Sequence, residues 1–194
     1  AVVPVRESYP GWDGVPYRKL QDKSLLQLTL DGAAAASSVS HILVSSESRD
    51  VLEYSNNLIS RGLLPNHMTM LRSHKKATHK NLPAKEILSE AVEEYKNWQN
   101  AAPDIVLFLS IHAPNRKSHH IEEAINLLLV TEADSVFSVS REREPIFSHG
   151  RDGLNLLNPG RFAGLNYEKE QLYRFNGSII ALWSDVLMSQ DNIF

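Results

Sequence analysis

The run DIVLFLS, residues 104–110, restricts the possible folds more than any other stretch of the chain. Its side chains are apolar at consecutive positions, so a strand formed here needs cover on both of its faces. Helices on both sides of a parallel sheet provide that cover. Residues 83–98, just before this run, carry apolar side chains along one helical stripe and carboxylates opposite, as a helix packed on a sheet does. Together the two segments predict a helix and a central strand of an α/β fold.

Further segments alternate in the same way along the chain. We expect the other strands at residues 1–5, 41–46, 134–140 and 177–183. We expect the other helices at residues 24–37, 47–60 and 118–130, with Ser46 and Ser118 as N-caps of the last two. This order predicts a three-layer α/β sandwich with a mostly parallel sheet, built as one domain over residues 1–194. The chain begins inside a strand and ends soon after one, which leaves open that segments are missing at both ends.

The charge and composition of the chain argue against two classes of partner. The formal net charge is −3 and basic and acidic residues are interspersed, so no field is expected that attracts nucleic acid or an anionic membrane. No run of about eighteen apolar residues is present to span a bilayer. Cysteine is absent, which excludes disulfides and thiolate nucleophiles. We therefore expect a cytoplasmic protein without nucleic-acid or membrane partners.

The loops expected at the carboxyl ends of the strands are the places to look for a ligand site, because ligands of parallel sheets bind there. These loops are residues 6–19, 45–48, 110–117 and 140–143. Arg6 leaves the first strand, where a guanidinium can hold a phosphate through two parallel hydrogen bonds, although many loop arginines are simply solvated. Gly11 and Gly14 permit close approach to the backbone, but their spacing fits neither a Walker loop nor a dinucleotide-binding fingerprint.

The loop SIHAPNRKSHH, residues 110–120, concentrates basic and polar side chains in front of a helix. His112 and Arg116, together with the positive helix N-terminus, suit an anion, and simple capping and solvation are the alternative. His119 and His120 are neighbours on the helix and point about 100° apart, so they do not readily share a metal ion. No metal ligand is predicted.

Two further polar residues, Arg174 and Asn176, precede the strand expected at 177–183. An asparagine followed by a glycine is typical of a turn. From the residues alone a turn is therefore favoured over a ligand contact.

The order of several motifs resembles the acylneuraminate cytidylyltransferases, also called CMP-sialic acid synthetases, over nearly the whole chain. VPVR at 3–6 stands where that family has I-P-A-R, and HILVSSES at 41–48 is similar to its V-V-V-S-T-D strand. PDIVLFLSIHAPNR at 103–116 is similar to P-D-I-V-x-L-L-Q-P-T-S-P-L-R. ADSVFSVSRE at 133–142 and YRFNGSIIAL at 173–182 resemble its A-D-S-V-x-S-V strand and its N-G-S-I-Y segment. The resemblance implies a Rossmann-like nucleotidyltransferase fold.

The resemblance also implies an activity: transfer of CMP from CTP to the anomeric hydroxyl of an acidic, nonulosonate-type sugar, with release of pyrophosphate and help from magnesium. It implies catalytic roles on the phosphates for Arg6 and Lys19, and nucleotide binding by these two residues with Lys23 and Ser110. For the sugar it implies contacts from His112, Arg116, Arg174 and Asn176. A homodimer is expected by the same resemblance.

Several positions depart from the family pattern. ESYPG replaces its G-G-S-K-G after the arginine, so Glu7 brings negative charge and Tyr9 brings bulk to the place where a triphosphate would approach backbone amides. Val15 and Pro16 align with its K-N pair, and its metal-binding aspartates would follow Phe194. Losing several groups that act as a unit tends to abolish chemistry. Two functions therefore stay open: a divergent cytidylyltransferase, or a catalytically degenerate protein that serves as a binding, regulatory or oligomerising module.

Overall fold

The computed structural model describes residues 1–65, 69–73, 83–142, 145–157 and 172–190. The chain divides into two compact units. Unit 1 comprises Ala1–Ser138 and Gly177–Phe194, and unit 2 comprises Val139–Asn176. In the described part of the chain, no helix combines the length and the apolar character that crossing a membrane requires.

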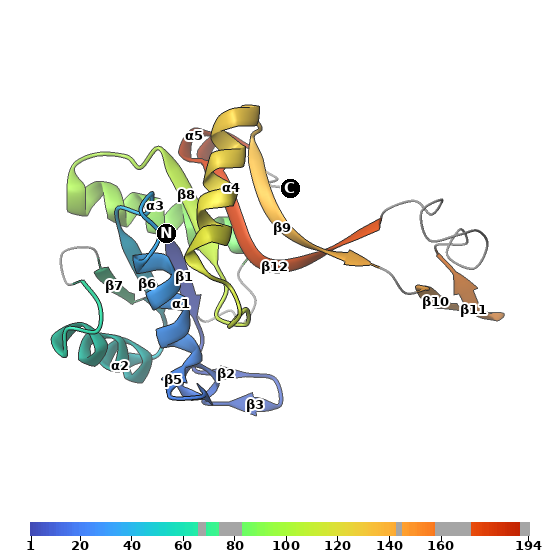
Figure 1. Cartoon of the computed structure of the whole chain (residues 1–194), viewed down its shortest axis with the longest axis horizontal. Coiled ribbons are helices and arrows are strands. Elements are labelled where there is room, and N and C mark those ends of the chain that lie inside the picture. The colour runs from blue at the N-terminus through green and yellow to red at the C-terminus, as the bar shows by residue number, and fades with distance from the viewer. Residues whose placement is uncertain (66–68, 74–82, 143–144, 158–171, 191–194) are drawn as a thin grey trace. The chain divides into compact units, whose positions relative to one another are not determined.

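A six-stranded sheet is the central element of unit 1, and two of its strands, β9 and β12, continue into unit 2 (Figure 1). In the order in which they lie side by side, the strands are β7 (Thr69–Ser73), β6 (Ile42–Ser46), β1 (Val2–Val5), β8 (Ile105–Leu109), β12 (Leu172–Trp183) and β9 (Ser135–Glu142). Strand β1 is parallel to β6 and to β8, β6 is parallel to β7, and β12 is antiparallel to β8. The sheet is mostly parallel, as predicted.

Helices cover both faces of this sheet (Figure 1). They are α1 (Leu25–Ala34), α2 (Arg49–Ser60), α3 (Ala84–Gln99), α4 (Ser118–Thr131) and α5 (Ser184–Ser189). Neighbouring residues of β1 face opposite layers, as strand geometry requires. Val3 belongs to a buried cluster with Leu30 and Ile121 of α1 and α4, whereas Val2 belongs to another with Leu88 of α3. The predicted three-layer architecture is confirmed, and the two buried faces explain why β8 is apolar at consecutive positions.

The starts of two helices differ from the prediction by one or two residues. Ser48, and not Ser46, is the N-cap of α2: its side chain accepts a hydrogen bond from the backbone N–H of Val51. Ser46 ends strand β6 instead, and its hydroxyl oxygen accepts a hydrogen bond from the N–H of Ser48. Ser118 is the first residue inside α4, and Lys117 holds the N-cap position. For α2 the error arises because serines occur at both 46 and 48, and only the backbone path decides between them. For α4 it arises because a lysine, which is not a usual capping residue, holds the N-cap position.

Strand β7 (Thr69–Ser73) was not predicted, because its sequence TMLRS carries a charge in the middle of an edge strand. The charge is Arg72, whose side chain is only 5% exposed. Its guanidinium forms ion pairs with Glu90 at 2.6 Å and Glu94 at 2.8 Å, both on α3. The two carboxylates compensate the buried cation, so this strand packs against a helix without an apolar side chain at that position.

Unit 2 contains a β-hairpin in which β10 (Phe147–Gly150) pairs antiparallel with β11 (Gly153–Leu156). Arg174 and Asn176 lie within the part of β12 that belongs to this unit. The turn favoured for Asn176 and Gly177 is therefore wrong: both residues are part of the strand, and Gly177 supplies a φ of +65° inside it.

Candidate functional site

The sheet has a topological switch point between β1 and β8. From β1 the chain proceeds to β6 and β7 on one side, and then returns to place β8 on the other side of β1. Ligands of such sheets bind in the crevice beyond the carboxyl ends of the strands at this point. Figure 1 shows that the short strands after β1 and the loop after β8 reach the same edge of the sheet. The predicted residues Arg6 and Ser110 begin these two segments.

The segment after β1 is tightly folded and does not form an open loop. Strands β2 (Ser8–Tyr9) and β3 (Trp12–Asp13) make a hairpin, whose turn contains Gly11 at a φ of +78°. A 3-10 turn follows over Val15–Tyr17, and the side chain of Val15 is 6% exposed and packs in the core of unit 1. Glycine-rich phosphate loops instead present successive backbone N–H groups to the ligand. Here residues 8–13 instead form a hairpin, and the chain after it packs into the core through Val15.

Tyr9 connects the segment after β1 with the loop after β8. Its hydroxyl oxygen accepts a hydrogen bond of 3.4 Å from the backbone N–H of Arg6. Its ring lies edge-on to the ring of His112, with the centroids 4.5 Å apart. Burial raises the pKa of Tyr9 and lowers the pKa of His112, although part of His112 is exposed to solvent. Two aromatic side chains, from the segments after β1 and β8, therefore meet at the switch point.

Glu7 connects the same segment to the start of α2. One of its carboxylate oxygens accepts a hydrogen bond of 2.7 Å from the hydroxyl of Ser48. Burial, followed by the charges of Glu7 and Asp50, raises the pKa of the Tyr17 hydroxyl to about 12. These carboxylates make this side of the site negative, which opposes a polyphosphate.

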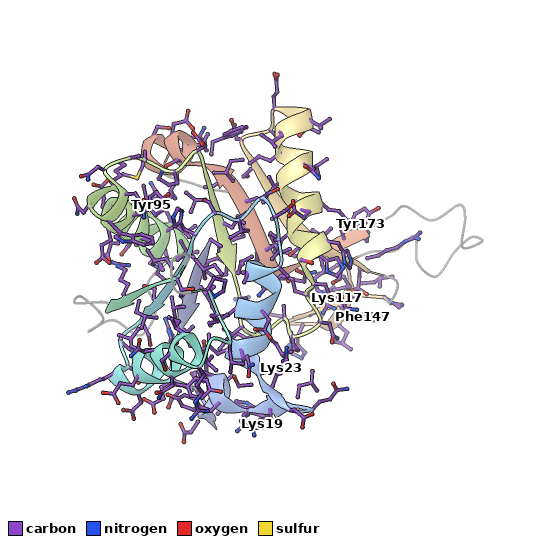
Figure 2. All side chains as sticks on the ribbon, turned by 60° about the vertical axis from the view of Figure 1, so that its left-hand side comes forward. Lys19, Lys23, Tyr95, Lys117, Phe147 and Tyr173 are labelled. Atoms are coloured by element: carbon purple, nitrogen blue, oxygen red, sulfur yellow. The ribbon has the colours of Figure 1, made fainter. Side chains whose placement is uncertain are left out.

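The lysines expected at the phosphates lie in two short strands near α1. Lys19 is exposed in β4 (Lys19–Leu20), and Lys23 is exposed in β5 (Lys23–Ser24). Figure 2 shows both at one end of unit 1, with Tyr95 of α3 at the other end. The ammonium of Lys23 lies 2.6 Å from a carboxylate oxygen of Asp31. Asp31 thus compensates the charge of Lys23, and Lys19 is the stronger candidate for a phosphate contact.

Arg116 fastens the loop after β8 to strand β12. Its side chain is buried, with the residue 7% exposed, and Nη1 donates hydrogen bonds to the carbonyl oxygens of Ser110 at 2.9 Å and Ser178 at 2.7 Å. Nε and Nη2 are buried without a hydrogen-bond partner, and burial lowers the pKa of Arg116 to about 10. The sequence motif placed Arg116 correctly in this loop, but could not reveal that its donors point at backbone carbonyls.

The two remaining predicted residues belong to unit 2. Arg174 Nε lies 3.6 Å from a carboxylate oxygen of Glu142, and the amide of Asn176 donates a hydrogen bond of 3.1 Å to the hydroxyl of Ser140. Arg174 and Asn176 are both exposed. The structure thus places Arg6, Ser110, His112 and Arg116 in unit 1, on the segments that follow β1 and β8, and Arg174 and Asn176 in unit 2.

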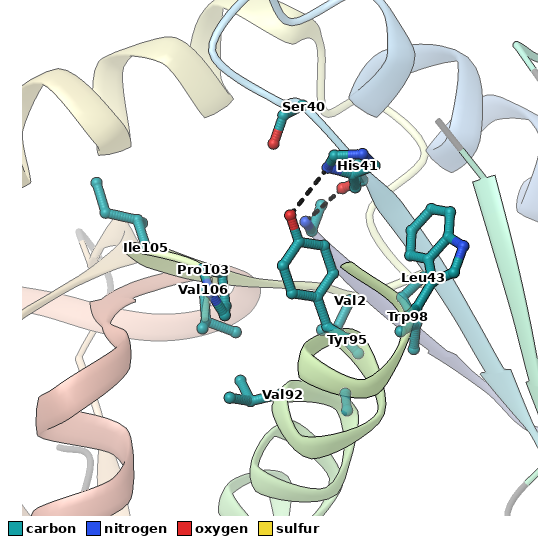
Figure 3. Close-up of a pocket in the computed structure, with 12 residues that line it drawn as sticks. Val2, Ser40, His41, Leu43, Val92, Tyr95, Trp98, Pro103, Ile105 and Val106 are labelled. Atoms are coloured by element: carbon teal, nitrogen blue, oxygen red, sulfur yellow. Dashed lines mark hydrogen bonds between the residues drawn. The ribbon is translucent and has the colours of Figure 1, made fainter. Parts of the chain in front are cut away.

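A pocket at the opposite edge of the sheet has a different character (Figure 3). His41, Tyr95 and Trp98 line it together with apolar side chains of α3 and of the first residues of β1 and β8. The Tyr95 hydroxyl lies 3.1 Å from Nδ1 of His41, and the rings of His41 and Trp98 are 5.1 Å apart. Its volume of about 50 Å³ suits a few water molecules and is too small for a nucleotide. The edge of the sheet at the switch point is therefore the better candidate for a nucleotide site.

The described residues do not provide a metal site. In the parts of the chain that the structure describes, no three His, Asp or Glu side chains come together so that they could hold a metal ion. Glu7 and Asp50 both act on the pKa of Tyr17 and therefore lie near its hydroxyl. Magnesium at a nucleotide is usually held by one or two carboxylates together with the phosphates of the ligand.

Comparisons with known proteins find similarity at the level of the fold. No family model matches the sequence, and no curated protein matches it. Among solved structures, the chain is similar to CMP:2-keto-3-deoxy-manno-octonic acid synthetase complexed with CTP, with a TM-score of 0.67 and 15% identity over 96% of this chain and 74% of the other. It is also similar to 4-diphosphocytidyl-2C-methyl-D-erythritol synthase from Anaerococcus prevotii, with a TM-score of 0.63 and 12% identity over 95% of this chain and 70% of the other. The Rossmann-like nucleotidyltransferase fold is confirmed.

Proposed function

We propose that this chain is a cytidylyltransferase that transfers CMP from CTP to an acidic, nonulosonate-type sugar and releases pyrophosphate. The observation that carries the proposal is the position of Arg6 and Ser110 at the ends of β1 and β8, on the two sides of the switch point. The structural neighbour with CTP, a synthetase whose name states that it makes a CMP derivative of an acidic sugar, supports the nucleotide and the class of acceptor.

The proposed reaction requires positioning and charge more than covalent help from the protein. The anomeric hydroxyl attacks the α-phosphorus of CTP, the bond from this phosphorus to the bridging oxygen breaks, and pyrophosphate leaves with its electron pair. The hydroxyl proton passes to solvent. Arg6 binds the phosphates through its guanidinium, and Lys19 adds a second cation. Ser110, on the loop after β8, faces the nucleoside, and His112 on the same loop faces the sugar. No step in this proposal uses a metal held by the protein.

For the acidic sugar we propose the guanidinium of Arg174 and the amide of Asn176, which suit a carboxylate and a hydroxyl group. Their exposure in β12 keeps these groups accessible. Arg116 was expected in the same role, but its Nη1 already serves two carbonyl oxygens. We therefore assign Arg116 to the support of the Ser110 loop.

We further propose that the protein is a homodimer that uses unit 2. This unit exposes several large apolar side chains, which single domains seldom leave in water. They are Phe147, at 46% exposure, Leu154, at 68%, Leu157, at 62%, Tyr173, at 57%, and Phe175, at 46%. Light scattering coupled to size-exclusion chromatography should give twice the mass of the chain, and Leu154→Glu should shift it to the monomer.

Calorimetric titration tests the nucleotide. We expect the protein to bind CTP more tightly than ATP, GTP or UTP, both in the presence and in the absence of magnesium. Arg6→Ala should abolish this binding, while the matched control Arg61→Ala, an exposed arginine after α2, should leave it unchanged. Absence of binding to every nucleotide would overturn the proposal and favour a non-catalytic module. If CTP binds, pyrophosphate release with a series of acidic sugars then identifies the acceptor.

A further inference from the structure

Tyr9 lies at the edge of the sheet where the proposed function places the nucleotide. Tyr9 follows β1, and His112, whose ring it contacts, follows β8. This ring contact therefore joins the segments on the two sides of the switch point. The two rings meet edge-on at an interplanar angle of 79° and a centroid distance of 4.5 Å. At this distance the rings are in contact, and nothing of the size of a nucleobase fits between them.

The hydroxyl of Tyr9 also engages a group that a phosphate would use. The backbone N–H of Arg6 donates to this oxygen at 3.4 Å. Backbone N–H groups at the end of a first strand are natural donors to phosphate oxygens. In this structure the tyrosine therefore satisfies the donor next to the arginine proposed to hold the phosphates.

We propose that Tyr9 controls access of the nucleotide to this site: the ring must leave His112, and its hydroxyl must leave the Arg6 amide, before CTP binds. This inference rests on the proposed function. The closed arrangement weakens the observed affinity for CTP, because the observed dissociation constant is the intrinsic constant divided by the fraction of open molecules. Loss of one aromatic pair corresponds to a change of roughly three- to tenfold in that constant.

The surroundings of Tyr9 allow the ring to move while the segment stays in place. Tyr9 is half-buried, and its turn neighbours Pro10 and Gly11 are exposed. The segment keeps two other attachments, the hydrogen bond from Ser48 to Glu7 and the packing of Val15 in the core. Shortening Tyr9 should therefore free the His112 ring and the Arg6 amide without unfolding the segment that carries Arg6.

Calorimetry with CTP on three variants tests the proposal. Tyr9→Ala should bind CTP roughly three- to tenfold more tightly than the unmodified protein. Tyr9→Phe keeps the ring against His112 but frees the Arg6 amide, so its affinity for CTP should lie between those of the unmodified protein and Tyr9→Ala. Trp12→Ala is the matched control: this aromatic residue lies in the same hairpin and is 59% exposed, with its ring under Arg18. It should leave the affinity unchanged.

Proton–carbon NMR of the His112 ring gives a second readout that does not depend on the affinity. The ring current of Tyr9 should shift the His112 resonance in the free protein, and saturating CTP should move it to its position in Tyr9→Ala. If CTP binds while this resonance stays in place, or if Tyr9→Ala binds equally or more weakly, the access role is overturned and the proposed function stands. If neither the unmodified protein nor Tyr9→Ala binds any nucleotide, both are overturned.

Discussion

The guanidinium of Arg116 donates a 2.7 Å hydrogen bond to the carbonyl oxygen of Ser178, on β12. The same carbonyl accepts the backbone N–H of Ser110 at 3.3 Å. Arg116 thus holds the end of β8, where the loop with Ser110 and His112 begins, against the neighbouring strand. A cation usually expected to meet a ligand anion is used here to shape the loop.

Replacement of Arg116 by methionine should destabilise the protein by about 1–2 kcal/mol, because two charge-assisted hydrogen bonds to carbonyl oxygens are lost. The loss is limited because the buried Nε and Nη2, which have no hydrogen-bond partner, disappear as well. Chemical denaturation measures the free energy of unfolding. Arg49→Met, with a side chain that is 89% exposed, should change it by less than about 0.5 kcal/mol. Equal stability of the two variants would contradict the anchoring role.

Replacement of Glu7 by glutamine should tighten CTP binding by about three- to tenfold, because one negative charge near the phosphates is removed. Glutamine can still accept the hydrogen bond from Ser48, so the segment should keep its attachment to α2. Calorimetric titration measures the affinity, and Glu53→Gln, an exposed carboxylate on α2, is the control. Weaker binding by Glu7→Gln would mean that the carboxylate itself is needed at the site.

Replacement of Ser48 by alanine should lower the free energy of unfolding by about 1 kcal/mol, the usual cost of losing an N-cap. The variant loses the hydrogen bond to the N–H of Val51 and also the donor to Glu7. Ser60→Ala, near the end of the same helix, should cost less than about 0.5 kcal/mol. If the two variants are equally stable, Ser48 does not cap α2 in solution.

Glu122 should make the stability of unit 1 sensitive to acid. Hydrogen bonds from the hydroxyl and N–H of Ser38, and a further one from Ser37, lower the pKa of this carboxylate below its ordinary value of 4.5. A lowered folded-state pKa means that the unfolded chain binds the proton more readily, so the contribution is present above pH 4.5 and is lost as the pH falls through the folded-state pKa.

The variant Glu122→Gln should therefore be less stable than the unmodified protein near neutral pH, and the difference should shrink in acid. Denaturation at about pH 7 and about pH 3 measures it. Glu123→Gln, the next residue along α4, should show no such change of difference with pH. A difference that is equal at the two pH values would show that the Ser37 and Ser38 contacts do not depend on the charge of Glu122.

The sequence predicted the layers well because they follow from local periodicity. In the apolar run of β8 and the amphipathic stripe of α3, the spacing of neighbouring residues alone predicts which side chains are buried. Strand β7 was not predicted because it contains Arg72. The carboxylates that compensate this charge lie on α3, 18 residues or more further along the chain.

The contacts of the candidate site could not be predicted in the same way. The Tyr9–His112 and Glu7–Ser48 contacts join loops that are distant in sequence, and no period or motif pairs these side chains. The sequence did indicate that Glu7 and Tyr9 are unusual in this place. Only the fold shows their contacts: Glu7 accepts a hydrogen bond from Ser48 at the start of α2, and the ring of Tyr9 contacts His112.

Because the Val15 side chain is part of the core of unit 1, changes in the segment after β1 also affect the stability of this unit. Replacing Val15 by glycine would leave a cavity, because the Val15 side chain fills part of the core. A substitution that reshapes this segment at Val15 therefore also requires compensating substitutions in the core. Directed evolution towards a new acceptor should therefore succeed more readily at exposed neighbours such as Trp12 than at Val15 itself.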